Sequence, residues 1–351
     1  TNGTTTLDRN LTATNTNINN NSTLALNNST VNSAIKTDGT GNLSLSGIND
    51  ITGDVGEISK QLNNIEALAN SNTTFNNNIY ANNINLNTNS ILDSKGNITS
   101  NVNGAAVNTG TLNISGPNNQ VITGNIGTIE NLNLNSGRVV RTDGDVNATN
   151  TNINSNSTLE LVSGKNIDSV INGNTGNLTL LGTSTISEDI QSLNNLRLNA
   201  NTSNSLLQGI VNSTNITSTG SGSSTFEDIV TTTNLVLNNG NMTFNEDLNS
   251  INTTIGSGRL NLDKNLLGTT VNFTNTLGEL NLNDGANVDV TNLGVDTTKG
   301  NLNIAGNSNI SGDINLKNIN ITGTNQVVNL KDDVNAIRTT ISNSTVNFNQ
   351  D

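Results

Sequence analysis

Cysteine, histidine and tryptophan are absent from this chain of 351 residues, and aromatic residues make up only 2% of it. The absence of Cys and His excludes thiol chemistry, disulfide bonds, imidazole catalysis and zinc sites built on either ligand. A secreted eukaryotic domain so poor in aromatic residues would usually carry disulfide bonds. Their absence fits a bacterial protein that stays unfolded while it crosses an envelope.

Large apolar side chains are also scarce, since hydrophobic residues account for 31% of the chain. An ordinary compact core gains much of its buried area from Phe, Tyr and Trp. About 80 residues are Asn, and Thr, Ser and Gly supply much of the rest. Composition alone therefore favours disorder or a prion-like tract. Disordered chains do not keep Leu, Ile and Val at fixed spacing, however, and this chain does.

The charge is acidic, with a net value of −13 and a pI near 4.2. Its 14 basic residues are scattered, so neither nucleic acid nor an anionic membrane surface is an expected partner. No stretch is apolar enough to span a bilayer, and we expect no direct membrane insertion by this segment. Because the chain begins at Thr1 without a signal peptide, we interpret it as a processed or excised segment.

Several phrases of the sequence are repeated. GNLSLSGINDITGDV at 41–55 returns without a gap as GNLNIAGNSNISGDI at 300–314, and GNLTLLGTSTISEDI at 176–190 is a further copy. ATNTNINNNSTLAL at 13–26 returns as ATNTNINSNSTLEL at 148–161. We therefore predict one continuous repeat domain. Its ranges are 1–351 for the domain, about 1–135 and 136–265 for the long internal repeat, and 266–351 for a partial third copy.

A shorter unit is marked by an apolar–polar–apolar triplet that often recurs 18 to 22 positions along the chain. Alternation with period two indicates a strand with one buried face. Gly, Asn, Asp and Thr lie between the triplets, and these residues suit tight corners. Strands that alternate with corners predict the coils of a solenoid. The expected inward column contains Leu43, Leu45, Leu112, Ile114, Leu178, Leu180, Leu302 and Ile304.

Magnitudes explain why such coils must stack. Each buried aliphatic side chain contributes roughly 1.5–3 kcal/mol, and ordering a coil of ~20 residues costs about 1.5 kcal/mol per residue. A single coil is therefore unstable, whereas stacked coils share a hydrogen-bonded ladder and a continuous apolar column. Equivalent Asn side chains should also form amide ladders along the axis. The prediction is an all-β parallel β-helix with coils of about 20 residues.

The segment EISKQLNNIEALAN at 57–70 also fits a helix, because Ile58, Leu62 and Ile65 lie on one helical face. Its counterpart, LNNLRLNAN at 193–201, alternates like a strand. We favour a strand at 62–70 and leave open a short helical turn at 57–61.

Three phrases carry a family resemblance: VITGNIGTIENLNLNSG at 121–137, TTFNNNIYANNINLNTNSIL at 73–92 and VNFTNTLGELNLNDGANV at 271–288. They resemble passenger regions of Gram-negative autotransporters, most closely the large rickettsial surface-antigen (outer-membrane protein) passengers. The resemblance implies a right-handed β-helix that is exported through an outer-membrane barrel and displayed on the bacterial cell surface. It also implies a non-catalytic structural or adhesive function. Such a virulence-related passenger would self-associate into rods or an S-layer-like coat, or contact a host-cell surface receptor.

The alternative is a carbohydrate-active or phage-tailspike-like β-helix. An enzyme of that kind needs paired carboxylates or a carboxylate–metal cluster, together with aromatic platforms for sugar rings. Adjacent strand residues point to opposite faces and cannot act as pairs unless they lie in loops. Tyr80 is the only Tyr, so a platform is hard to build. We expect no catalytic residue, and interpret as surface charges Asp143/Asp145, Glu188/Asp189, Glu227/Asp228, Glu246/Asp247 and Asp332/Asp333.

No cofactor is expected, although the Asp–Gly corners of TDGTGN at 37–42 and TDGDVN at 142–147 are candidates for weak Ca²⁺ binding. The serial GGxGxD pattern of calcium-binding β-rolls is absent. Turn chemistry explains Asp–Gly at these corners at least as well. The sequence therefore leaves any metal site undetermined.

Overall fold

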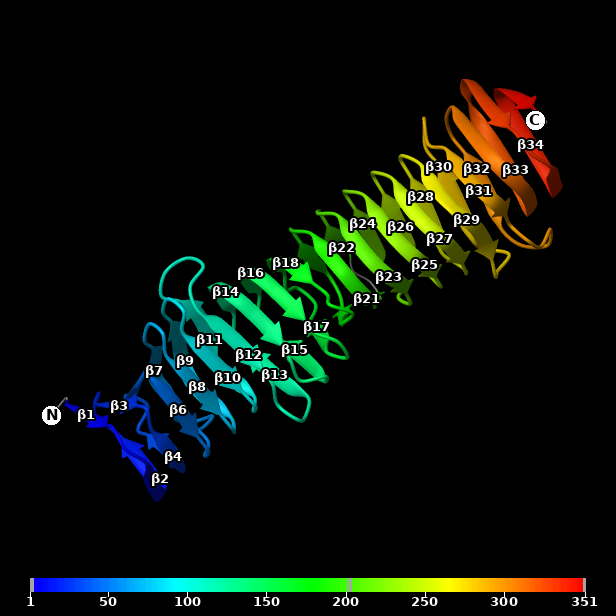
Figure 1. Cartoon of the computed structure of the whole chain (residues 1–351). Coiled ribbons are helices and arrows are strands. Elements are labelled where there is room, and N and C mark those ends of the chain that lie inside the picture. Colours follow the sequence, from blue (N-terminus) through cyan, green and yellow to red (C-terminus); the bar gives the residue numbers. More distant parts are fainter. Residues whose placement is uncertain (1–2, 200, 202–203, 350–351) are drawn as a thin grey trace. The chain divides into compact units, whose positions relative to one another are not determined.

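The computed structural model describes residues 3–199, 201 and 204–349 (Figure 1). Its fold is all-β, a right-handed parallel β-solenoid with coils of about 19 residues. This confirms the predicted fold class. The chain divides into two compact units, Thr1–Leu178 and Thr179–Asp351, which we call the first and the second unit.

Strands of four to nine residues build the first unit. They are β1 (Thr4–Leu7), β2 (Leu11–Ile18), β3 (Thr23–Asn27), β4 (Thr30–Thr37), β5 (Asn42–Ser46), β6 (Ile48–Ile51), β7 (Leu62–Ala67), β8 (Asn72–Phe75), β9 (Ile79–Leu86), β10 (Ile91–Ser94), β11 (Ile98–Gly104), β12 (Thr111–Ile114), β13 (Gln120–Thr123), β14 (Ile126–Leu134), β15 (Val139–Thr142), β16 (Val146–Ile153), β17 (Thr158–Leu161) and β18 (Ile167–Asn172). The boundary between the units falls within β19 (Asn177–Leu180).

Short and long strands alternate through most of the second unit. They are β20 (Ser184–Ile186), β21 (Ile190–Leu198), β22 (Asn204–Leu207), β23 (Val211–Ser218), β24 (Ser223–Phe226), β25 (Val230–Leu237), β26 (Asn241–Phe244), β27 (Leu248–Ile255), β28 (Arg259–Leu262), β29 (Leu266–Phe273), β30 (Glu279–Leu282), β31 (Val288–Leu293), β32 (Asn301–Ile304), β33 (Ser308–Leu330) and β34 (Val334–Phe348).

Each strand pairs in parallel with the equivalent strand of the next coil. In the first unit β3 pairs with β5, which places Leu24 opposite Leu43 and Leu26 opposite Leu45. In the second unit β28 pairs with β30, and Leu260 lies opposite Leu280. Because paired residues lie side by side, the inward side chains of successive coils form continuous columns.

The columns form the core. The expected inward residues are confirmed, since each of the eight is at most 1% exposed: Leu43, Leu45, Leu112, Ile114, Leu178, Leu180, Leu302 and Ile304. Phenylalanines add to the core where they occur. In the second unit the rings of Phe226 and Phe244 stack with 4.7 Å between their centroids.

A coil of the second unit illustrates how one sequence repeat closes. β26 buries Met242 and Phe244, and a corner of three residues then leads into β27. Along β27 the alternation breaks at Ile251 and Asn252, which are both exposed. Two successive outward residues mark a bend within the strand. β27 therefore contributes two sides of the coil, and β26 contributes the third.

Asparagine supplies the backbone conformations that the corners need. Among the described residues, ten of the thirteen non-glycine residues with positive φ are Asn. Left-handed backbone is costly for most side chains, and Asn is among the few that adopt it readily. The abundance of Asn therefore belongs to the fold itself, as the corner composition predicts.

The ambiguous segment 57–70 is a turn followed by a strand. Glu57 and Lys60 form an isolated antiparallel bridge with reciprocal backbone hydrogen bonds of 3.0 Å. β7 then runs over Leu62–Ala67. The strand prediction is confirmed over these residues, whereas residues 68–70, which were also expected in the strand, lie in the turn that follows it. The helical turn left open at 57–61 is a bridged turn instead.

The long repeat is visible in the strand boundaries. β2 and β16, which carry the two copies of ATNTNIN, each have eight residues and start at equivalent positions. The prediction of one continuous domain over 1–351 is untested and stays a prediction. Residues 1–2 and 350–351, at its two ends, lie outside the described residues.

Candidate functional site

Acidic residues are the first candidates for chemistry. In the second unit, three of the five acidic pairs lie at the same corner in different coils, between a short strand and the long strand after it. Asp143/Asp145 lies before β16 in the first unit, and Asp332/Asp333 lies between β33 and β34. Together with two neighbours, the three pairs form what we call the acidic corner: Glu188, Asp189, Glu227, Asp228, Glu246, Asp247, Asp263 and Asp284.

Several of these carboxylates accept backbone hydrogen bonds from the next coil. Asp189 accepts from the N–H of Ile210 at 2.9 Å, and Asp247 accepts from the N–H of Asn265 at 3.1 Å. Asp284 likewise accepts from the N–H of Asn307 at 2.8 Å. Asp189, Asp247 and Asp284 therefore join successive coils, a role that the interpretation as plain surface charges does not include.

Asp143 and Asp145 have separate partners. Asp143 accepts a hydrogen bond from Arg141 at 2.7 Å. Asp145 accepts the backbone N–H of Asn166 at 2.9 Å. Its own N–H donates to the side chain of Asn125 in the previous coil, at 3.0 Å. Asp145 therefore belongs to a chain of corner side chains along the coils. Across the described ranges 3–199, 201 and 204–349, no three Asp or Glu side chains come together as a metal site would require.

The Asp38–Gly39 corner uses its carboxylate within the chain. Asp38 accepts hydrogen bonds from the hydroxyl and backbone N–H of Thr40, at 2.6 and 3.0 Å, and from the N–H of Asn20 at 3.0 Å. The hydrogen bond from the Thr40 hydroxyl is the largest cause that lowers the pKa of Asp38, to about 2. This is the turn chemistry that the sequence offered as an alternative to Ca²⁺.

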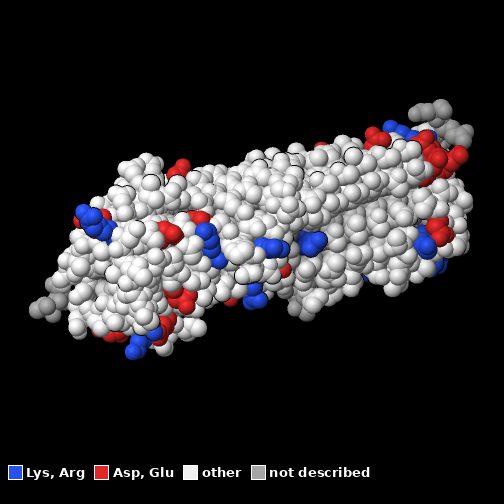
Figure 2. All heavy atoms as spheres, turned by 60° about the horizontal axis from the view of Figure 1, so that its bottom comes forward, with Lys and Arg blue, Asp and Glu red and all other residues white. Residues whose placement is uncertain are grey.

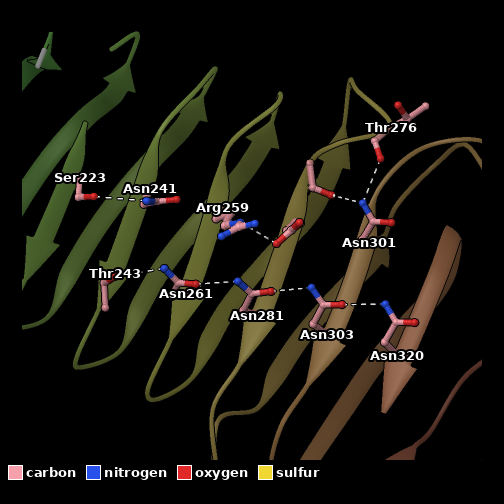
Figure 3. A network of polar contacts seen from close by, with 12 residues as sticks. Ser223, Asn241, Thr243, Arg259, Asn261, Thr276, Asn281, Asn301, Asn303 and Asn320 are labelled. Carbon is pink, nitrogen blue, oxygen red and sulfur yellow. Dashed lines mark hydrogen bonds and ion pairs between the residues drawn. The ribbon is translucent and has the colours of Figure 1, made fainter. Parts of the chain in front are cut away.

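Rows of side-chain amides cross the outer face of the second unit, as Figure 3 shows. Asn281 donates to Asn261 at 2.7 Å, Asn303 to Asn281 at 2.7 Å and Asn320 to Asn303 at 2.8 Å. Asn261 begins the row by donating to the hydroxyl of Thr243 at 3.3 Å. The predicted asparagine ladders are therefore confirmed.

The first unit has a row of its own. Asn133 donates to Asn113 at 2.8 Å, Asn152 to Asn133 at 2.7 Å and Asn172 to Asn152 at 2.9 Å. In both rows each side chain lies on a strand paired in register with the next, so equivalent amides come within reach of one another. Identical amides in register can bond in this way along many strands.

Charged side chains are sparse on the surface. Figure 2 shows Lys, Arg, Asp and Glu scattered over the visible face, with wide uncharged areas between them. The ion pairs are at least partly exposed, for example Lys36 with Glu57 at 2.9 Å. Exposed pairs of this kind contribute about 0–1 kcal/mol each. The surface of the protein is therefore dominated by neutral amide and hydroxyl groups.

The first unit also has surface depressions that sequence reasoning missed. One, of about 470 Å³, is lined by Lys36, Asp54, Gly56, Glu57, Ile58 and Tyr80, among others. A second, of about 390 Å³, is lined by Gln61, Asn82, Asn83, Thr99, Asn101 and their neighbours. Tyr80 stood out in the sequence as the lone Tyr, but its surroundings depend on coils that are distant in sequence. The sequence signal that could have indicated these depressions was the uneven spacing of the triplets around residues 45–65.

Comparisons with known proteins were negative. No protein-family model matches the chain, and searches of curated proteins and of solved structures found no significant match. Within the part of the chain that the structure describes, no helix has the length and apolar character needed to cross a membrane.

Proposed function

We propose that this chain is a cell-surface structural and adhesive protein, a non-catalytic passenger of the autotransporter type that is displayed on a bacterial outer surface. The observation that carries the proposal is the use of polar side chains between coils. Amide rows and corner carboxylates join one coil to the next, for example Asn303 to Asn281 and Asp247 to Asn265. These contacts favour a durable scaffold, since a hydrogen bond to a side chain contributes about 0.5–1.5 kcal/mol.

Exposure on the cell surface is the direct test of the proposed location. Antibodies raised against the purified chain should stain intact cells of the source organism, and external protease should remove the signal. A cytoplasmic protein probed in parallel serves as the integrity control. Staining that requires permeabilised cells would contradict the proposal.

The proposal includes the absence of catalysis. Hydrolysis of a glycosidic bond needs an acid and a second carboxylate on opposite sides of the bond. In the acidic corner, Asp189 and Asp247 instead accept backbone hydrogen bonds. Incubation with polysaccharides and peptides should therefore release no product above background. Turnover that disappears in Asp247→Asn or Glu246→Gln would favour the carbohydrate-active alternative.

Self-association is the second part of the proposed function, and the acidic corner sets its salt dependence. With a net charge of −13, copies that approach side by side repel one another at low ionic strength. Salt screens exposed charges over about 8–10 Å under physiological conditions. Sedimentation should show larger assemblies as salt or Ca²⁺ is added, and smaller ones with a chelator at low salt. A monomer under every condition would favour isolated adhesive rods.

A further inference from the structure

A glycine lies between two larger side chains in the depression beside Tyr80. Ile35, Val55 and Ile79 are bridged in parallel, so Lys36, Gly56 and Tyr80 occupy equivalent positions in three successive coils. Backbone hydrogen bonds hold this register, from Gly56 to Ile35 at 2.8 Å and from Tyr80 to Val55 at 2.7 Å. Adjacent strands lie about 4.8 Å apart, so Lys36 and Tyr80 are separated by roughly twice that distance. Lys36, Gly56 and Tyr80 all line the depression, which we call the slot.

Backbone geometry requires a glycine at position 56. Its φ is +72°, and a Cβ there would lie 2.2 Å from the carbonyl oxygen of Tyr80. Any other residue would be strained in its backbone and would clash with the next coil. Position 56 therefore stays without a side chain on this wall of the slot.

The bridged turn at 57–60 forms the rim of the slot. Glu57 forms an ion pair with Lys36 at 2.9 Å, and both side chains lie beside the opening. Ile58 projects into solvent, with 77% of its surface exposed. An exposed Ile on a turn held by reciprocal hydrogen bonds has no role in the core. It adds an apolar contact at the rim, on the same depression as the half-buried ring of Tyr80.

The second depression begins at the next residues of the same strand. Tyr80 lines the first depression, and Asn82 and Asn83 of β9 line the second. Gln61, directly after the bridged turn, lies on the second as well. Across it are uncharged hydroxyl and amide groups, including Thr99 and Asn101. A ligand that fills the slot beside Tyr80 can therefore extend over a neutral, hydrogen-bonding surface.

We infer that these adjoining depressions bind a neutral oligosaccharide, with one sugar ring against Tyr80 and the following rings over Asn82, Asn83 and Asn101. A sugar ring has an apolar C–H face and a rim of hydroxyl groups that both donate and accept hydrogen bonds. The depressions offer matching groups: the Tyr80 ring and Ile58 for the face, and carboxylate, ammonium, amide and hydroxyl groups for the rim. Their sizes of about 470 and 390 Å³ lie in the range of small-ligand sites.

The charges around the slot disfavour anionic ligands. Lys36 is paired with Glu57, so the carboxylate of Asp54 on the same depression is an excess negative charge that would repel an anionic sugar. A neutral ligand does not experience this repulsion and still gains hydrogen bonds to ionic groups, which are stronger than those to neutral groups. This inference names the ligand class of the proposed adhesive protein, and it therefore rests on the proposed function.

Binding is measured on the purified full chain by saturation-transfer difference NMR. The probes are the tetrasaccharides of glucose in β1–4 and α1–4 linkage and of N-acetylglucosamine, each with its monosaccharide. A heparin-derived tetrasaccharide and triarginine represent anionic and cationic ligands. We expect at least one neutral tetrasaccharide to bind more tightly than its own monosaccharide and more tightly than either charged probe. No binding of any neutral probe, or stronger binding of either charged probe, would overturn the inference.

Variants locate the site. Tyr80→Ala should weaken binding about tenfold, equivalent to about 1.4 kcal/mol, whereas Tyr80→Phe keeps the ring and should stay within about twofold, because the ring face makes the contact. Ile58→Ala should weaken binding, and Ile48→Ala, at a similarly exposed Ile of the first unit, should not. Unchanged binding in both Tyr80→Ala and Ile58→Ala, with wild-type circular dichroism, would place any sugar site elsewhere. Surface staining of cells is independent of these measurements, so the two proposals can fail separately.

Discussion

The central coils of the second unit are more regular in length than the coils around Tyr80 in the first unit. In the second unit, Val211 pairs with Val230, Val230 with Leu248 and Leu248 with Leu266, so successive coils have 19, 18 and 18 residues without a register shift. In the first unit, Val55 pairs with Ile79, Ile79 with Ile98 and Ile98 with Ile122, which gives 24, 19 and 24 residues.

The difference shows where a solenoid accommodates extra residues. The strands of the irregular coils still pair in parallel, and the added residues lie at the corners and bridged turns between them. Hollows such as the one beside Tyr80 lie next to these additions. Amide rows continue through coils of unequal length, since the row in Figure 3 joins positions 243, 261, 281, 303 and 320, which are 18, 20, 22 and 17 residues apart. Extra residues at the corners therefore change the outer surface without interrupting the rows.

The largest effect is expected from removing a core ring. Phe244→Ala should lower the free energy of unfolding by about 3–5 kcal/mol, because Phe244 is fully buried and stacks on Phe226. Phe75→Ala in the first unit should cost less by about 0.5–1.5 kcal/mol, since Phe75 lies between Ile51 and Ser94 and has no ring partner there. Denaturant unfolding followed by circular dichroism measures both. A greater loss for Phe75→Ala would contradict this account of the core.

The next effect separates steric clash from backbone strain. Gly56→Ala in the first unit and Gly285→Ala in the second both place Ala at positive φ, at +72° and +84°. Left-handed backbone costs a non-glycine residue about 1–2 kcal/mol. Only Gly56→Ala also meets a neighbouring carbonyl oxygen, whereas nothing lies within 4 Å of the new Cβ at Gly285. Gly56→Ala should therefore show the larger fall in thermal midpoint. Equal falls would contradict the close approach of Gly56 to the carbonyl oxygen of Tyr80.

Interior asparagines of the amide rows should have similar effects in both units. Asn281→Ala and Asn133→Ala each remove two side-chain hydrogen bonds. At roughly 0.5–1.5 kcal/mol per bond, each variant should lose about 1–3 kcal/mol of stability. Asn82→Ala, at an exposed position outside the rows, is the matched control and should change stability little. If the control loses as much as the other two, the rows do not contribute to stability.

The smallest effect is expected in acid. Asp38 in the first unit and Asp296 in the second have folded pKa values lowered to about 2, mainly by side-chain hydrogen bonds from Thr40 and Thr298. Because the folded pKa is below the unfolded one, both contribute stability above about pH 4, and this contribution is lost as the pH falls toward 2. Asp38→Asn and Asp296→Asn should therefore flatten the fall of the thermal midpoint between pH 4 and 2. A slope equal to that of the wild type would contradict the assignment.

Local pattern was enough to predict the core and the ladders. The two apolar residues of a Leu-x-Leu triplet both face inward, as Leu43 and Leu302 illustrate, because period-two alternation fixes the inward face. The rows of Asn follow from the same register. The slot beside Tyr80 could not be predicted, because it depends on which residues of coils 24 positions apart become neighbours. The bonding of Asp189 and Asp247 to the next coil was missed for the same reason.

The amide rows have a direction. In Figure 3 every amide nitrogen from Asn261 to Asn320 donates toward the preceding coil, and every accepting oxygen faces the following one. Backbone hydrogen bonds between coils run both ways, since Val211 donates to Ile229 while Asn241 donates back to Gly222. The side-chain dipoles of a row therefore add along the solenoid axis, and each polarises the next. The aligned amides give the row a net dipole along the axis. The parallel sheet gains this electrical polarity from its outer side chains.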